Sequence, residues 1–229
     1  MVFSKDNMKF SIITACFNSS ETIEKTIISV DQQTYPNIQH IVVDGNSTDS
    51  TLNIINKYKN QIDIIISEPD NGVYHAMNKG IQQADGDIIA FLNSDDFYNS
   101  KNVITNVAEK FKNELCDAIY GDLVYVSPED INKTIRYWKA GTYQKGKFFK
   151  GWVTPHPTFF CKRKIFQNYG CFNENFQIAA DFELMLRFVE KNNINISYLP
   201  EILVRMRAGG KANCFKGCIK GNKEIINSF

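Results

Sequence analysis

The sequence predicts an α/β protein built on a mainly parallel central sheet with helices on both faces. Short apolar, β-rich runs alternate with segments of helical periodicity through the first hundred residues. The runs are continuously apolar, which is typical of parallel strands buried on both faces. A length of 229 residues suits one compact domain, and 13 glycines and 6 prolines exclude collagen-like and disordered classes.

The first strand–helix unit shows how each element is identified. Residues 10–16 form a short apolar run rich in β-branched residues, and Asn18-Ser19-Ser20 follow as a helix N-cap signal. Apolar residues then recur at helical spacing from Ile23 to Val30. Tyr35-Pro36 ends the segment, because the residue before a proline disfavours helix.

Three further units repeat this pattern. They pair strands with helices at residues 39–44 and 52–58, 63–67 and 76–81, and 87–92 and 103–111. The carboxyl ends of parallel strands meet at one edge of a sheet, where ligands of such folds bind. Polar clusters follow each strand at that edge: Thr14–Asn18, Asp44–Asp49, Glu68–Gly72 and Asn93–Asp96.

The pattern changes after Cys116. Strands are expected at residues 118–126, 133–138, 194–199 and 202–207, with a helix around Asp181–Lys191 and a short basic helix within 213–228. Residues 1–130 carry nine Lys and Arg against nineteen Asp and Glu, whereas residues 131–229 carry seventeen against six. An acidic half suits a divalent metal, and a basic half suits phosphates or an anionic membrane surface; two solvated faces without a partner are the alternative.

Cysteine usage and the chain start indicate a cytoplasmic protein. The six cysteines show no CxxC pair, which favours buried reduced thiols. No apolar run reaches the ~18–20 residues that span a bilayer, and residues 1–7 show no secretory stretch. Met8 is an alternative start, because the first strand begins right after it.

The nucleotide signatures commonest in such sheets are missing. There is no GxGxxG after the first strand and no GxxxxGK[ST]. Asn93-Ser94-Asp95-Asp96 instead follows a buried strand, where its oxygens suit Mg²⁺ or Mn²⁺ bridging the phosphates of a nucleotide diphosphate. A helix N-cap is the equally weighted alternative for this cluster alone.

Taken together, six motifs in order resemble family 2 glycosyltransferases of the GT-A fold, of the bacterial polysaccharide type. They are FSIITACFN (10–18), VVDGNSTDST (42–51), EPDNG (68–72), MNKG (77–80), ADGDIIAFLNSDD (84–96) and IAADFEL (178–184). The resemblance implies one GT-A domain over 1–229, with a nucleotide-sugar-binding half (about 1–115), an acceptor-binding half (about 116–207) and a basic C-terminal segment (208–229).

The resemblance implies nucleotide-sugar contacts along the strand ends. The positions that match are Thr14, Ala15 and Asn18 in the nucleotide pocket, Asp44 at the base, Glu68, Asp70 and Gly72 beneath the uridine, and Lys79 at the diphosphate. Turn formation is the alternative for Asp44 and for the residues of the 68–72 motif, and a solvated helix lysine is the alternative for Lys79.

The resemblance also implies a metal site. Asp95 matches the second acid of the family's DxD motif and would ligate Mn²⁺ or Mg²⁺, while Asn93 replaces the first acid and would bind through water or contact the sugar. Ser94 would contact the nucleotide sugar. Asp96 would hold a donor hydroxyl or cap a helix. His156, between two prolines, would ligate the metal, donate to phosphate or acceptor, or serve the core.

Asp181 matches the family's catalytic base, with Ala180 in place of the usual preceding Glu. A carboxylate that only stabilises the helix dipole is the alternative, and Glu183 is a lower-ranked candidate base that points about 200° around the helix. Trp152 would stack on an acceptor sugar, or belong to the aromatic core.

The activity implied is inverting transfer of a hexose or N-acetylhexosamine from a UDP-sugar to a glycan acceptor, linked to polyprenyl diphosphate, in surface polysaccharide (for example O-antigen) synthesis. Peripheral contact with the inner face of the plasma membrane fits the basic half. A catalytically silent sugar-nucleotide or glycan-binding module is the alternative, since Asn93 and Ala180 replace acids. No nucleic-acid-binding motif is present.

Overall fold

The computed structural model describes residues 7–209, 221, 224–226 and 228. The strands are β1 (Phe10–Cys16), β2 (Ile38–Asp44), β3 (Ile64–Ser67), β4 (Ile88–Phe91), β5 (Phe97–Tyr98), β6 (Ala118–Val126), β7 (Thr134–Trp138), β8 (Phe160–Lys162) and β9 (Ile196–Arg207). The α-helices are α1 (Ile23–Asp31), α2 (Thr51–Lys57), α3 (Val73–Gln83), α4 (Val103–Asn113), α5 (Arg163–Tyr169) and α6 (Ala180–Leu186). Short turns of 3-10 helix lie at Phe148–Lys150 and His156–Thr158, and a π-helical turn, Arg187–Lys191, continues α6.

These strands form one nine-stranded sheet in the order β3-β2-β1-β4-β8-β6-β9-β5, with β7 paired to β6. The first four strands are parallel, as the sequence predicts. Cys16 pairs with Asp44, and Asp44 with Ser67, so three carboxyl ends lie level at one edge. β8 joins the two halves by antiparallel pairing to β4 and β6, so the sheet becomes mixed beyond β4.

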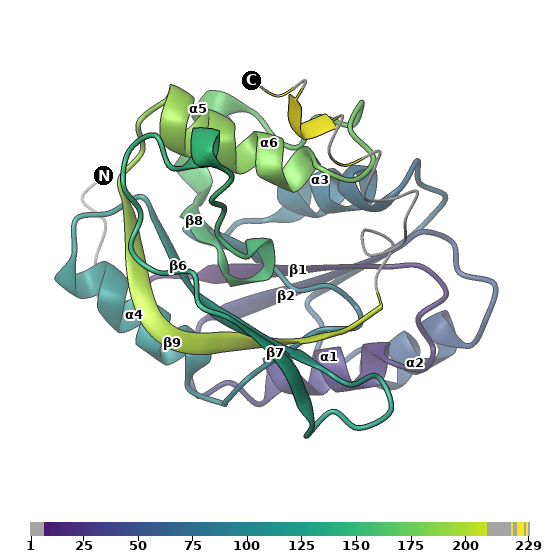
Figure 1. Ribbon diagram of the computed structural model, residues 1–229. Helices are drawn as coiled ribbons and strands as arrows, with labels where there is room; N and C mark the ends of the chain where they lie inside the picture. The colour runs from purple at the N-terminus through teal and green to yellow at the C-terminus, as the bar shows by residue number, and fades with distance from the viewer. Residues whose placement is uncertain (1–6, 210–220, 222–223, 227, 229) are drawn as a thin grey trace.

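Helices cover both faces of this sheet, which confirms the predicted α/β class (Figure 1). α3, α5 and α6 lie on one face, and α1, α2 and α4 lie on the other. Neighbouring residues of β1 serve the two cores, since Ile13 belongs to the cluster that contains Met77 and Leu184, whereas Ile12 belongs to the cluster that contains Ile104. Ile12 and Ile13 are both fully buried. This explains why the strands read as continuous apolar runs.

The structure differs from the expected elements mainly after β4. β9 is one twelve-residue strand, because its pairing with β6 skips Pro200 and Glu201 as a bulge and then resumes. The short strands β5 and β8 and the helix α5 were not predicted. Most of the expected helix at 213–228 lies outside the described residues.

Three of the four cysteines that the structure describes are buried, as the sequence predicts, and Cys171 is half-buried. Cys16, Cys116, Cys161 and Cys171 are unpaired, and the first three are buried; Cys214 and Cys218 lie outside the described residues. No helix in the described part of the chain has the length and apolar character needed to cross a bilayer.

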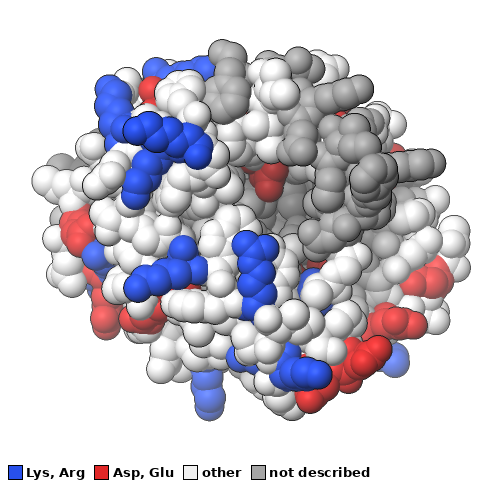
Figure 2. Space-filling view, in the orientation of Figure 1, with Lys and Arg blue, Asp and Glu red and all other residues white. Residues whose placement is uncertain are grey.

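The charge asymmetry of the sequence reaches the surface. Figure 2 shows Lys and Arg side chains over the upper left and centre of one face, with Asp and Glu side chains mainly at its lower right and lower left edges. Six bases of the acid-free stretch are exposed: Lys133, Arg136, Lys139, Lys145, Lys150 and Lys164.

Gly86, just before β4, allows the β1–β4 pair to form. A β-carbon at Gly86 would lie 2.7 Å from the backbone nitrogen of Ser11 and 2.8 Å from the carbonyl oxygen of Lys9. We therefore expect Gly86→Ala to lower the free energy of unfolding by about 1–3 kcal/mol in a urea titration. Exposed Ser100→Ala serves as the control, expected within about 0.5 kcal/mol of the parent. Equal stability of the two variants would contradict the close approach.

Candidate active site

A cleft at the carboxyl edge of the sheet brings together the loops that follow β1 and β4. It is lined by Asn18, Ser19, Ser20, Glu21, Thr22, Asp49, Ser94 and Asp95. The hydroxyl oxygens of Ser19 and Ser94 are 2.8 Å apart, which ties the two loops to each other. Three residues of the predicted site, Asn18, Ser94 and Asp95, thus share one cleft.

The side chain of Thr26, on α1, anchors the 93–96 loop by hydrogen bonds. Its buried hydroxyl lies 2.7 Å from the carbonyl oxygen of Asp96 and 3.0 Å from that of Ser94. Within the loop, the Asn93 amide donates to Asp96 Oδ2 at 3.0 Å. Sequence reasoning missed Thr26, because a threonine beside Ile27 on a buried helix face gives no signal of a loop contact.

In the 93–96 loop Asp96 is completely buried, whereas Asp95 is half-buried and lines the cleft. Burial raises the pKa of Asp95, and burial together with the charge of Asp95 raises that of Asp96 well above its ordinary value. Arg207, at the end of β9, opposes both shifts; its guanidinium donates to the carbonyl oxygen of Asp95 and lies 5.3 Å from the Phe97 ring centroid. Asp96 Oδ1 is buried without a hydrogen-bond partner.

The carboxyl groups of Asp95 and Asp96 fit a divalent cation. Coordination would give the unpartnered oxygen of Asp96 a partner and would stabilise the charged forms of both carboxyl groups. No group of three or more His, Cys, Asp or Glu side chains gathers in metal-binding geometry among residues 7–209, 221, 224–226 and 228. Mg²⁺ sites commonly take one or two carboxylates and complete their shell with substrate phosphates, so the residues present fit a cation held jointly with a bound diphosphate.

Asp44 lies at the end of β2, completely buried and already hydrogen-bonded. The Ser47 N–H donates to it at 3.1 Å, the Ser67 hydroxyl at 2.7 Å, and the Ser47 hydroxyl also donates. Asp70 lies close by, since a β-carbon at Gly45 would sit 2.4 Å from Asp70 Oδ2. These are the contacts that the turn-forming alternative expects, and a nucleobase would have to compete with them.

The 68–72 motif is braced by Lys79. The lysine ammonium lies 2.9 Å from Glu68, whose pKa it lowers, and donates to the Pro69 carbonyl oxygen at 2.9 Å. The Gly72 N–H donates to Asp70 Oδ1, and Gly72 has a φ of +115°, which favours glycine. Lys79 therefore holds the turn against α3.

Thr14 and Ala15 of β1 are both buried. The Thr14 hydroxyl lies 3.1 Å from His40 Nε2 on β2. Its side chain is thus engaged inside the sheet.

Asp181 lies in the first turn of α6, half-buried. The Tyr74 hydroxyl donates to the Ile178 carbonyl oxygen at 2.6 Å and lies 3.3 Å from Asp181 Oδ1. Burial lowers the pKa of His156, while the charge of Asp181 raises it, and His156 Nε2 is buried without a hydrogen-bond partner. Tyr74 was not predicted, because it reads as one more apolar position of a helix.

An aromatic cluster connects Asp181 with the 93–96 loop. His156 stacks on Phe91, with ring centroids 5.2 Å apart, and Phe91 meets Phe172 at 5.1 Å. Phe172 in turn packs on Tyr74 at 5.3 Å. Phe91 ends β4, two residues before Asn93, so the same cluster supports both groups of polar residues.

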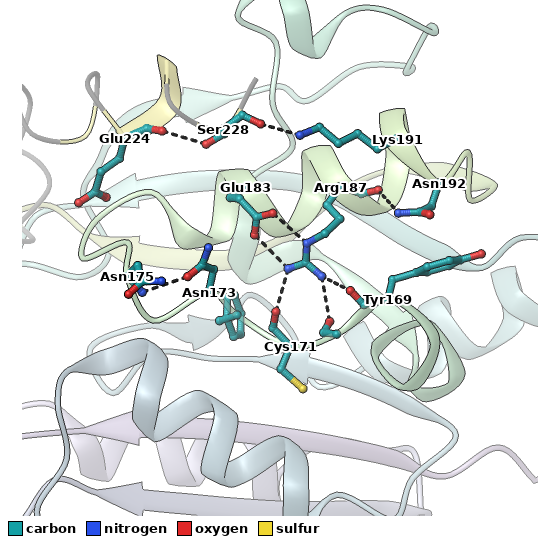
Figure 3. Close-up of polar contacts among 12 residues, drawn as sticks. Tyr169, Cys171, Asn173, Asn175, Glu183, Arg187, Lys191, Asn192, Glu224 and Ser228 are labelled. Atoms are coloured by element: carbon teal, nitrogen blue, oxygen red, sulfur yellow. Dashed lines mark hydrogen bonds and ion pairs between the residues drawn. The ribbon is translucent and has the colours of Figure 1, made fainter.

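Glu183 is committed to an ion pair with Arg187. The guanidinium donates to both carboxylate oxygens, at 2.8 and 2.9 Å, and also to the Cys171 carbonyl oxygen (Figure 3). This pairing supports ranking Asp181 above Glu183.

Trp152 is half-buried. Its indole N–H donates to the Ala140 carbonyl oxygen at 2.8 Å, and its ring packs on Tyr120, Tyr143 and Phe148.

Thr26→Val keeps the shape of the side chain and removes its hydroxyl. We expect the free energy of unfolding to fall by about 1–2 kcal/mol, because buried carbonyl oxygens of the 93–96 loop lose a donor. The matched control is Thr105→Val on α4, where the hydroxyl meets that of Thr34 at the surface. Chemical denaturation measures both, and a Thr26 effect no larger than the control's would contradict the loop anchor.

Comparisons with known proteins agree with this geometry. The model of the family described as "Glycosyl transferase family 2" matches residues 11–170. A PGL/p-HBAD biosynthesis glycosyltransferase of Mycobacterium bovis is 28% identical over 209 residues, covering 89% of this chain and 79% of its own.

Two solved structures share the fold. Staphylococcus aureus TarS 1–349 in complex with UDP-GlcNAc superposes with a TM-score of 0.73 at 21% identity, over 96% of this chain. The mannosyltransferase PcManGT of Pyrobaculum calidifontis, in complex with GDP-Man and Mn²⁺, gives 0.72 at 15% identity, over 97%. The chain spans 66% and 63% of those two chains. The matched family model and the shared fold together show that this chain belongs to glycosyltransferase family 2 and is a glycosyltransferase with the GT-A fold.

Proposed function

We propose that this protein is an inverting, metal-dependent transferase that moves a hexose or N-acetylhexosamine from a UDP-sugar to a glycan acceptor. Residues 1–115 bind the donor and residues 116–207 the acceptor. The observation that carries the proposal is the aromatic cluster, which supports Asp181 on one side and the 93–96 loop on the other. The UDP-GlcNAc bound to TarS and the Mn²⁺ bound to PcManGT support the donor and the cation.

Asp181 is the proposed base. Its carboxylate accepts the proton of the acceptor hydroxyl as that oxygen attacks the anomeric carbon, and the bond from that carbon to the diphosphate oxygen breaks. Attack opposite the departing UDP converts an α-linked donor into a β-linked product. The Tyr74 hydroxyl orients the carboxylate, lying 3.3 Å from Oδ1.

Asp95 is the proposed metal ligand, with Asn93 or His156 as a further ligand and Asp96 beside it at the loop. Mn²⁺ or Mg²⁺ bound there supplies positive charge that stabilises the departing diphosphate. Ser94 and Asn18 line the same cleft as Asp95 and are placed to contact the nucleotide sugar.

The proposed acceptor is a polyprenyl-diphosphate-linked oligosaccharide used in surface polysaccharide synthesis, such as O-antigen, reached by peripheral contact with an anionic leaflet. The β7 strand supports this location, because Ile135 and Tyr137 are 55% and 50% exposed and are flanked by the exposed bases Lys133, Arg136 and Lys139. Apolar side chains among bases suit an anionic membrane surface.

The first test is UDP release by the purified protein from a panel of UDP-sugars with Mn²⁺. We expect slow hydrolysis of one donor, and a loss of about 10²-fold or more in Asp181→Asn, because the amide cannot accept the proton. Glu183→Gln is the matched control on the same helix and should retain base function. Asp181→Asn that releases UDP at the parental rate would contradict the base assignment. UDP binding without release from any donor would favour the silent binding module.

The same assay tests the metal. EDTA should abolish release and added Mn²⁺ should restore it, while Asp95→Asn should raise the Mn²⁺ concentration needed for half-maximal release at least about tenfold, because it removes a charged oxygen ligand. Asp85→Asn, an exposed acid on the turn before β4, is the control. Release that is indifferent to EDTA would overturn the metal role of Asp95.

Membrane contact is tested by cosedimentation with vesicles of phosphatidylglycerol and phosphatidylcholine. The double variant Lys133→Gln, Lys139→Gln should bind about 30-fold more weakly, since each base near an anionic surface contributes about 1 kcal/mol. Lys57→Gln, Lys59→Gln removes two exposed lysines from the acidic half and should bind as the parent does. Equal binding of both double variants would count against this surface.

A further inference from the structure

The turn that leads into α6 has no cap of its own. Ala179 occupies the N-cap position and offers no side-chain hydrogen bond. A helix start leaves backbone N–H groups without helical partners, and those groups need an acceptor from elsewhere. At this helix start the Phe182 N–H donates to Asp181 Oδ1 at 2.8 Å. The N–H of the N-cap residue Ala179 instead has Glu224 as its acceptor, which comes more than 40 residues later in the chain.

Glu224 accepts three consecutive backbone N–H groups. Gln177 donates to Oε1 at 3.0 Å, and Ile178 and Ala179 donate to Oε2 at 2.9 Å each. The residue is 9% exposed, so these charge-assisted bonds are largely shielded from water. One carboxylate therefore fixes the whole turn before Asp181.

Other described residues of the same segment contact the turn before α6, the core that contains α6 and the π-helical turn that continues it. A β-carbon at Gly221 would lie 3.2 Å from Ile178 Cγ2, which shows how closely the backbone approaches this turn. Ile225 packs against the core that contains α6. The Ser228 carbonyl oxygen accepts from Lys191 at 2.7 Å, and the Ser228 hydroxyl donates to the Glu224 carbonyl oxygen (Figure 3).

We propose that Glu224 is a positioning residue for Asp181, acting through the turn it caps. This inference rests on the proposed role of Asp181 as base. The link is short, because the Tyr74 hydroxyl donates to the carbonyl oxygen of Ile178, inside the capped turn, and lies 3.3 Å from Asp181 Oδ1. When Glu224 holds Ile178 in place, the tyrosine hydroxyl and the carboxylate keep their relative positions.

The chain offers a matched control in Glu190. It is 8% exposed and also accepts backbone N–H groups, from Gly146 at 2.9 Å and from Phe148 at 3.3 Å. It caps a loop between β7 and β8, since the backbone N–H groups that it accepts belong to that loop. Glu224→Gln and Glu190→Gln each replace one acceptor oxygen by a donor group at a buried cap, so a merely structural effect should be similar in both.

The kinetic test is a double-mutant cycle on UDP release with Mn²⁺ and the UDP-sugar that the panel identifies. Glu224→Gln should lower kcat about 10–100-fold, since a misplacement of about 1 Å costs about 10²-fold, with the donor KM within about threefold. Glu190→Gln should stay within about threefold in both constants. The double variant Asp181→Asn, Glu224→Gln should be no slower than Asp181→Asn alone, because Glu224 acts through Asp181.

A second measurement needs no turnover. Amide hydrogen exchange of the peptide covering residues 177–183 should be at least about tenfold faster in Glu224→Gln and unchanged in Glu190→Gln, because only the first variant uncaps that turn. Unchanged exchange in Glu224→Gln would overturn the inference whatever the kinetics show.

The outcomes separate the two proposals. A slow Asp181→Asn together with multiplicative losses in the double variant, or with no kinetic loss in Glu224→Gln, would overturn the role of Glu224 and leave the proposed function standing. Parental UDP release by Asp181→Asn would overturn the base assignment, and the inference about Glu224 with it.

Discussion

The stacking of His156 on Phe91 is the contact on which the site depends. The ring centroids are 5.2 Å apart, and the two residues come from opposite halves of the chain. Phe91 ends β4, the last strand of the parallel β3-β2-β1-β4 group, and sets the start of the 93–96 loop, while His156 begins a 3-10 turn before β8. Both rings are almost completely buried, and together with the β4–β8 pairing their contact joins the parallel half to the half that carries Asp181.

The sequence predicted the first half of the fold well, because each of its elements is specified locally. β1 and the apolar spacing of α1 need no distant partner to be recognised, and their observed bounds follow the predicted ones closely. The second half depends on pairing between distant segments. β8 has only three residues, and β9 continues past Pro200 because β6 pairs with it on both sides of the bulge.

The same distinction applies to the site. Asp95 and Asp181 were predicted because motifs mark them, whereas Thr26, Tyr74 and Glu224 act through tertiary contacts that leave no local pattern. Glu224 is the clearest case, because it lies in a segment whose lysines led to a prediction of membrane contact. Its carboxylate caps a turn that is adjacent only in the folded chain.

The buried carboxyl groups differ in whether the protein supplies a hydrogen-bond partner for each oxygen. Asp44, Asp122, Glu190 and Glu224 are each at most 9% exposed, and each accepts hydrogen bonds from protein N–H or hydroxyl donors. These carboxylates therefore have hydrogen-bond partners within the protein itself. Asp96 is buried as completely, yet among the carboxylates of the described residues it alone has a buried oxygen without a partner.

The unpartnered oxygen of Asp96 is relevant to position 93, where Asn93 stands in place of the first acid of the expected DxD motif. An aspartate there would place a third negative charge beside Asp95 and Asp96, with Arg207 as the nearby cation. Asn93 instead is uncharged, and its amide N–H donates to Asp96 Oδ2 at 3.0 Å. The replacement therefore avoids a further repulsion between carboxylates and fixes the position of one carboxylate oxygen. The other carboxylate oxygen, Asp96 Oδ1, has no hydrogen-bond partner. The replacement therefore reduces the charge of the site and at the same time orders the carboxyl groups that a divalent cation would meet.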